Sequence, residues 1–100
     1  MRDRKVRLFL RLTPDVNESL RFRMRYRGDL SRCVDSALNS ADLGSVKLDD
    51  LVPGRSAPAL TAVVSGRANA RIRSAAQQRG CTVTTLANSV LRKWLENENG

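Results

Sequence analysis

The stretch Lys5-Val6-Arg7-Leu8-Phe9-Leu10-Arg11-Leu12 decides the fold. Its even-numbered residues are all apolar, and its odd-numbered residues are basic except for Phe9. Because successive side chains of a β-strand point to opposite faces, this alternation predicts a strand with one buried face and one exposed face. The exposed face would then carry Lys5, Arg7, Phe9 and Arg11.

A helix is expected directly after this strand. Thr13, Pro14 and Asp15 supply a capping hydroxyl, a proline suited to the first helical position and an acid in the first turn. The helix should end at Arg27-Gly28, since glycine tolerates the left-handed conformation of a helix C-cap. A second helix is expected over residues 30–43, with its apolar positions facing a core.

The pattern occurs twice in the chain. When the sequence is shifted by 52 residues, Leu20, Arg21 and Gly28 fall on Ile72, Arg73 and Gly80. Past the glycine the offset is 53, so the first copy lacks one residue in the turn, where insertions are best tolerated. In residues 21–27 arginine alternates with apolar or aromatic residues, as in a basic strand. Residues 68–78 of the second copy show no such alternation, which favours a helix in both copies.

The second copy predicts a strand over residues 59–64, with Leu60, Ala62 and Val64 inward and Ala59, Thr61 and Val63 outward. The last helix should run from Thr82 or Val83 to near Glu96, and the tail beyond it should be frayed. We therefore divide the chain into a first motif (residues 1–43), a linker (residues 44–58) and a second motif (residues 59–100).

Composition points to a polyanionic partner. Lysine and arginine total 18 against 10 acidic residues, a formal charge of +8. With no histidine and two widely spaced cysteines, the chain lacks the usual base and ligand set of an enzyme or zinc site. We expect no catalysis and no cofactor, two reduced thiols on packed helices, a cytoplasmic location and no membrane-spanning segment.

One strand followed by two helices, with basic side chains on the strand and a glycine turn between the helices, resembles the ribbon-helix-helix family of Arc/MetJ-type DNA-binding proteins. In the first copy the resemblance rests on Arg7, Phe9, Arg11, Thr13, Val16, Leu20, Gly28 and Ser31. In the second copy, residues 79–87 are similar to the family's interhelical turn, whereas the outward Ala59, Thr61 and Val63 depart from its usual polar side chains.

The resemblance implies a mainly α fold with a short antiparallel two-stranded β-ribbon. Two fused ribbon-helix-helix motifs would form an intertwined pseudo-dimer, an architecture similar to that of the TraY-type accessory proteins of conjugative plasmids. A lone strand leaves its hydrogen-bonding groups unpaired, and a unit of ~40 residues cannot cover its own apolar faces. We prefer pairing of the two motifs within one chain, although pairing between chains stays open.

In this family the ribbon enters the major groove of double-stranded DNA. We expect Arg7 and Arg11 to contact guanine, and Phe9 and Thr61 to contact thymine methyl groups, with Thr61 adding a hydroxyl. Because the second strand carries no charge outward, the two halves of the ribbon should contact unlike half-sites. Two chains side by side on DNA would restore the symmetry as an inverted repeat.

Phosphate groups should bind at the starts of the second helices, where backbone N–H groups lack partners within the helix. The expected phosphate contacts are Lys5, Leu30, Ser31, Thr82, Val83 and Thr84. Lys5 would act mainly through non-specific attraction to the backbone.

The sequence thus predicts a sequence-specific DNA-binding protein, in the role of a bacterial or plasmid-type transcriptional repressor. One alternative is an accessory protein at a conjugative transfer or partition origin, and another is a basic module that binds RNA or an acidic protein through residues 21–27. The basic strand residues can also serve only to keep a strand edge soluble. Phe9 can fold inward in the absence of DNA.

Overall fold

The computed structural model describes residues 4–23, 29–48 and 59–99. Six elements follow in chain order: β1 (Lys5–Arg11), α1 (Pro14–Arg23), α2 (Asp29–Ser40), β2 (Ala59–Ser65), α3 (Gly66–Arg79) and α4 (Val83–Asn99). The described part of the chain is therefore mainly helical, with one antiparallel sheet of two strands. The fold class expected from the sequence is confirmed at this level.

The two strands form a ribbon in which Phe9 lies opposite Thr61, Arg7 opposite Val63 and Arg11 opposite Ala59. The alternation predicted for both strands is confirmed, because the inner face is buried and the outer face is exposed. Leu8, Leu10, Leu60, Ala62 and Val64 form the buried face.

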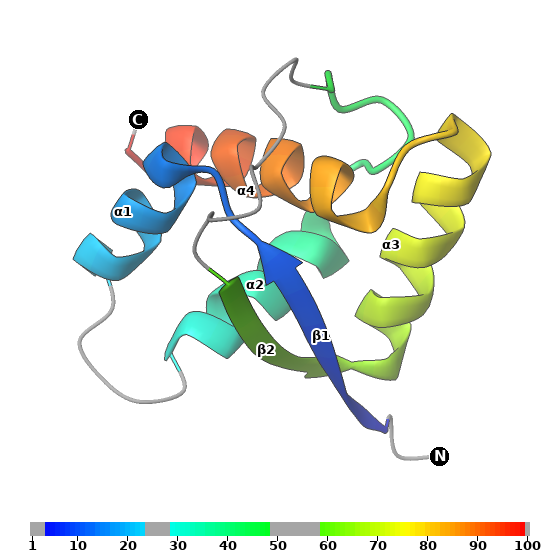
Figure 1. Cartoon of the computed structure of the whole chain (residues 1–100), viewed down its shortest axis with the longest axis horizontal. Coiled ribbons are helices and arrows are strands. Elements are labelled where there is room, and N and C mark those ends of the chain that lie inside the picture. Colours follow the sequence, from blue (N-terminus) through cyan, green and yellow to red (C-terminus); the bar gives the residue numbers. More distant parts are fainter. Residues whose placement is uncertain (1–3, 24–28, 49–58, 100) are drawn as a thin grey trace.

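Figure 1 shows α1 and α3 at opposite sides of the molecule, with α4 running between them and α2 behind the ribbon. The helices bury one apolar stripe each against the ribbon and against one another. Val16 and Leu20 of α1, Val34 and Leu38 of α2, Ile72 of α3, and Leu86, Val90 and Leu91 of α4 are almost completely buried. One core thus holds both halves of the chain.

Local signals fix the helix ends much as expected. Helix α1 begins at Pro14, but the Thr13 hydroxyl expected to cap it instead donates to the Asp15 carboxylate at 2.6 Å. Helix α3 is preceded by Ser65, whose hydroxyl accepts a hydrogen bond from the N–H of Ala68 at 3.1 Å. Gly80 ends α3 in the left-handed region, with a φ of 66°, where only glycine is unstrained. The predicted end of the first helix at residues 27–28 and most of the linker lie outside the described residues.

Helix α2 ends at Ser40 and not at Leu43 as the sequence suggested. After the last helical hydrogen bond, from Ala41 N to Ala37 O, the chain turns at Asp42, whose carbonyl accepts from the N–H groups of Ser45 and Val46. The guanidinium of Arg71 in α3 donates to the carbonyls of Asn39 and Ala41, so that groups left unpaired by the helix end are satisfied. Leu43 is still buried, in the turn.

Two further expectations need correction. Helix α4 continues to Asn99, whereas the sequence suggested an end near Glu96 and a frayed tail. Cys81 lies in the bend after Gly80 and not on a helix, although Cys33 is buried on α2 as expected. Both cysteines are thiols and neither forms a disulfide.

Candidate nucleic-acid interface

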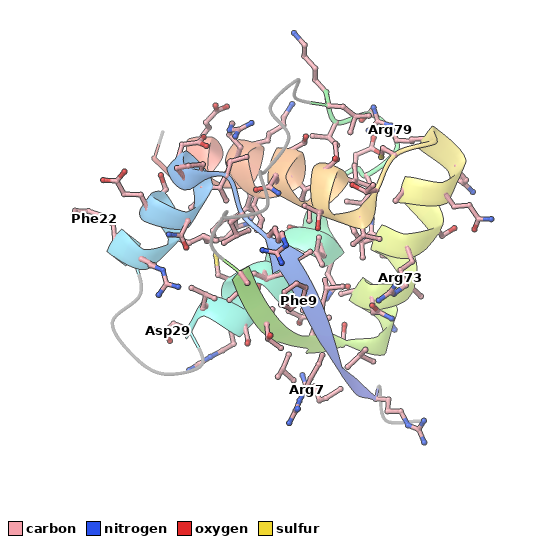
Figure 2. The ribbon with its side chains drawn as sticks, viewed as in Figure 1. Arg7, Phe9, Phe22, Asp29, Arg73 and Arg79 are labelled. Carbon is pink, nitrogen blue, oxygen red and sulfur yellow. The ribbon has the colours of Figure 1, made fainter. Side chains whose placement is uncertain are left out.

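The outer face of the ribbon combines exposed basic and apolar side chains. Lys5, Arg7, Phe9 and Arg11 project from β1, and Ala59, Thr61 and Val63 project from β2. None of these seven residues is acidic. We call this set the outer ribbon face. Figure 2 shows Arg7 pointing away from the helices, and its guanidinium has no hydrogen-bond or ion-pair partner within residues 4–23, 29–48 and 59–99.

Phe9 lies at the centre of the outer ribbon face and points outward, with 57% of its surface exposed. The inward position considered for this side chain is therefore not the one observed. The guanidinium of Arg11 lies over the Phe9 ring, 5.8 Å from its centroid. At this distance the ring attracts the cation and restricts its motion. Arg11 is thus held above the ribbon surface, while Arg7 is not.

Helix α2 covers the free edge of β2. The Ser31 hydroxyl accepts a hydrogen bond from Val63 N at 2.9 Å, and the Asp35 carboxylate accepts one from Ser65 N at 2.8 Å. These N–H groups point away from β1, so Arg7 and Val63 form a non-hydrogen-bonded pair. Because hydrogen-bonded and non-hydrogen-bonded pairs alternate along an antiparallel ladder, Phe9–Thr61 and Arg11–Ala59 are also non-hydrogen-bonded pairs. Side chains of such pairs approach one another closely. The outer ribbon face is therefore a compact surface.

Helix α4 holds the end of β1 through Asn88, which is 1% exposed. The Asn88 oxygen accepts from Thr13 N at 2.9 Å, and its nitrogen donates to the carbonyls of Arg11 and Thr84, each at 2.8 Å. Asp35 and Asn88 were not identified as site residues from the sequence. The sequence does contain a signal for them, because Asp35 and Asn88 are polar residues at equivalent positions of the two copies.

Several other side-chain hydrogen bonds recur at equivalent positions of the two halves. Arg21 Nε donates to Asn17 Oδ1, and Arg73 Nε donates to Asn69 Oδ1, both at 3.0 Å. The second-helix side chains of Arg92 and Asn39 donate to the hydroxyls of Thr13 and Ser65, at 2.9 Å and 3.4 Å. In each pair of bonds, the corresponding residues are 52 or 53 positions apart in the sequence, which are the offsets of the repeat.

Arg92 also forms an ion pair with Asp15 in the first turn of α1, with Nε 2.7 Å from Oδ2. Hydrogen bonds from Arg92 lower the pKa of Asp15 from 3.8 to about 2, with a smaller contribution from the Thr13 hydroxyl, while partial burial opposes the shift. The contact joins the start of α1 to α4 and so supports the end of β1.

The starts of the second helices differ in charge. Before α4, the Thr82 hydroxyl accepts from Thr85 N at 3.1 Å, and the N–H groups of Val83 and Thr84 precede the first backbone hydrogen bond, from Leu86 N to Thr82 O. This end is uncharged and suited to a phosphate. Helix α2 instead begins with Asp29, whose carboxylate lies 3.3 Å from Arg32.

The phosphate contacts expected at Leu30 and Ser31 therefore meet an acidic helix start. Both residues are half-buried in the first turn of α2, and the Ser31 hydroxyl is already bonded to β2. The carboxylate of Asp29 counteracts the positive end of the helix dipole, which is equivalent to about half a charge. Of the predicted phosphate contacts, Thr82, Val83 and Thr84 have the more favourable surroundings.

The helical arginines lie apart from the outer ribbon face. Arg73 lies on α3, away from Arg7 in Figure 2, and Arg21 lies on α1; both are exposed. Phe22, on α1, is 91% exposed. Most of the run 21–27, which the alternative function would use, lies outside the described residues.

No family model, curated protein or solved structure matches this chain. Within the described residues, no helix combines the length and the apolar composition needed to cross a bilayer.

Proposed function

We propose that this protein binds double-stranded DNA sequence-specifically, with the outer ribbon face in the major groove. The observation that carries the proposal is the antiparallel pairing of β1 with β2, with Arg7, Phe9 and Arg11 outward opposite Val63, Thr61 and Ala59. A two-stranded ribbon has the width that the major groove of B-DNA admits. Arginine is the side chain that most often identifies guanine there.

The distribution of charge also favours an arrangement in which the outer ribbon face meets DNA. The outer ribbon face carries Lys5, Arg7 and Arg11 without an acid, and the chain as a whole has a charge of +8. The uncharged start of α4 offers the N–H groups of Val83 and Thr84 to a phosphate. Lys5 lies at the end of the ribbon, opposite Ser65, where it can attract the DNA backbone.

We further propose that the chain is a tandem ribbon-helix-helix protein whose two motifs form an intertwined pseudo-dimer. The order strand, helix, helix occurs twice, and the side-chain hydrogen bonds of Asn17 and Asn69, of Asp35 and Asn88, and of Asn39 and Arg92 recur at the offsets of the repeat. Its proposed role is that of a bacterial or plasmid-type transcriptional repressor, which acts by occupying promoter DNA.

The test compares two double variants that each remove two positive charges. In Arg7→Ala/Arg11→Ala the ribbon loses its proposed base contacts, whereas in Arg21→Ala/Arg73→Ala two equivalent, exposed helical arginines are lost. Fluorescence anisotropy would measure the binding of each to a preferred duplex and to a scrambled duplex, over a range of salt concentrations.

The ribbon variant should bind both duplexes with equal, weak affinity, since each base contact contributes about 1–3 kcal/mol of discrimination. The helical variant should keep the preference, with at most a smaller slope of log affinity against log salt. The reverse result, with the preference lost only in the helical variant, would exclude the ribbon as the recognition element.

A further inference from the structure

The register of the ribbon places all of its outward charge on one strand. Along the outer ribbon face, β1 presents Lys5, Arg7, Phe9 and Arg11 in a row, and β2 presents Val63, Thr61 and Ala59 beside the last three of these. Phe9 and Thr61 are equivalent positions of the repeat and also face each other, so the pseudo-twofold axis passes through this pair. The axis relates Arg7 to Ala59 and Arg11 to Val63, and each arginine therefore has an apolar counterpart.

We propose that one chain recognises an asymmetric DNA element whose two specific guanines lie on the same DNA strand. This inference rests on the proposed function. The two rows are ~4.8 Å apart, so in a groove each row lies nearer to the bases of one DNA strand. Because Arg7 and Arg11 share the β1 row, both meet the same DNA strand. The β2 row has no bidentate donor for the other strand.

The spacing of the guanines follows from strand geometry. Arg7 and Arg11 are four residues apart on one face, which is ~14 Å at 3.4 Å per residue. Base pairs rise by ~3.4 Å along the DNA axis, so the separation corresponds to about four base pairs for a ribbon parallel to the axis. A ribbon that follows the inclined groove spans fewer. The two guanines are expected about two to four base pairs apart, with the Phe9–Thr61 pair over the bases between them.

The two arginines should differ in stringency. Arg11 is held over the Phe9 ring at 5.8 Å, whereas Arg7 extends from the ribbon without a partner in the described residues. An arginine that is already positioned loses less conformational freedom on binding. The guanine contacted by Arg11 should therefore be the more strictly required of the two.

The experiment is a selection of bound sequences from random duplexes, with the wild-type chain and three variants. Wild type should yield a site with both guanines on one strand, and replacement of either guanine should weaken binding roughly 5- to 150-fold. Arg7→Ala should relax one guanine position, and Arg11→Ala should relax the other. Ala59→Arg/Val63→Arg places arginines at the equivalent positions of β2, both exposed, and should turn the selected site into a palindrome.

A site with one guanine on each strand, or a short palindrome bound by a single wild-type chain, would overturn the asymmetric assignment while leaving DNA recognition by the ribbon intact. The assignment would also be overturned if Arg7→Ala and Arg11→Ala relaxed the same position. Failure to enrich any sequence would instead overturn the proposed function. Circular dichroism of each variant, compared with that of wild type, separates loss of recognition from loss of folding.

Discussion

Arg7 and Arg11 differ in their surroundings on the outer ribbon face. Arg7 and Arg11 have the same side chain on the same face, yet only the guanidinium of Arg11 lies over the Phe9 ring, 5.8 Å from its centroid. The alternation of the sequence predicted the outward positions of Arg7, Phe9, Arg11 and Thr61 correctly. The alternation could not predict the contact between Arg11 and Phe9, because side-chain conformation depends on neighbours that strand periodicity does not describe.

At the same scale, Asp15→Asn should destabilise the fold by about 1 kcal/mol at pH 7, since an ion pair this exposed to solvent is strongly screened. The pKa of Asp15 is lowered from 3.8 to about 2 in the folded chain, so its contribution is present above pH 3.8 and is lost as the pH falls toward 2. Urea unfolding at several pH values would show the difference between wild type and variant shrinking over this interval. Glu18→Gln, an exposed change on the same helix, should shift the free energy of unfolding by less than about 0.5 kcal/mol throughout. A difference that stayed constant down to pH 2 would contradict the assigned role of Asp15.

At the scale of elements, local signals predicted the helix starts and the left-handed turn, whereas contacts between distant residues determined the rest. Pro14 and Gly80 act within one turn, so their effects could be inferred from the sequence. The end of α2 depends on Arg71, about 30 residues further along the chain, and the edge of β2 depends on Ser31 and Asp35. These contacts have no local signal in the sequence, and for this reason the sequence alone predicts a phosphate at Ser31 and a helix that reaches Leu43.

Asn88→Ala tests whether α4 holds the end of β1. The change removes the partners of Thr13 N and of the Arg11 carbonyl in a buried setting, and should lower the free energy of unfolding by about 2–3 kcal/mol. Asn39→Ala, an exposed change on α2 that removes one hydrogen bond of 3.4 Å, should cost less than about 0.5 kcal/mol. Denaturant unfolding measures both, and equal effects of the two changes would argue against a special role for Asn88.

At the scale of the whole molecule, the fold brings two strands from opposite halves of the sequence into one ribbon whose basic face is exposed. Hydrogen bonds recur at the repeat offsets, and the equivalent helices α1 and α3 lie on opposite sides of the molecule in Figure 1. The repeat was visible in the sequence because the turn glycines and core positions coincide. Ala59 and Val63 stand where the repeat would place arginines, and this difference should make the DNA site asymmetric.

The central claim, that the outer ribbon face is the surface that meets DNA, is tested most directly by the backbone amide NMR spectrum of the labelled chain as a preferred duplex is added. The largest chemical-shift changes are predicted at Arg7, Phe9, Arg11 and Thr61, with a second group at Val83 and Thr84. Changes confined to α1 and α3 around Arg21 and Arg73, with the ribbon amides unmoved, would contradict the account.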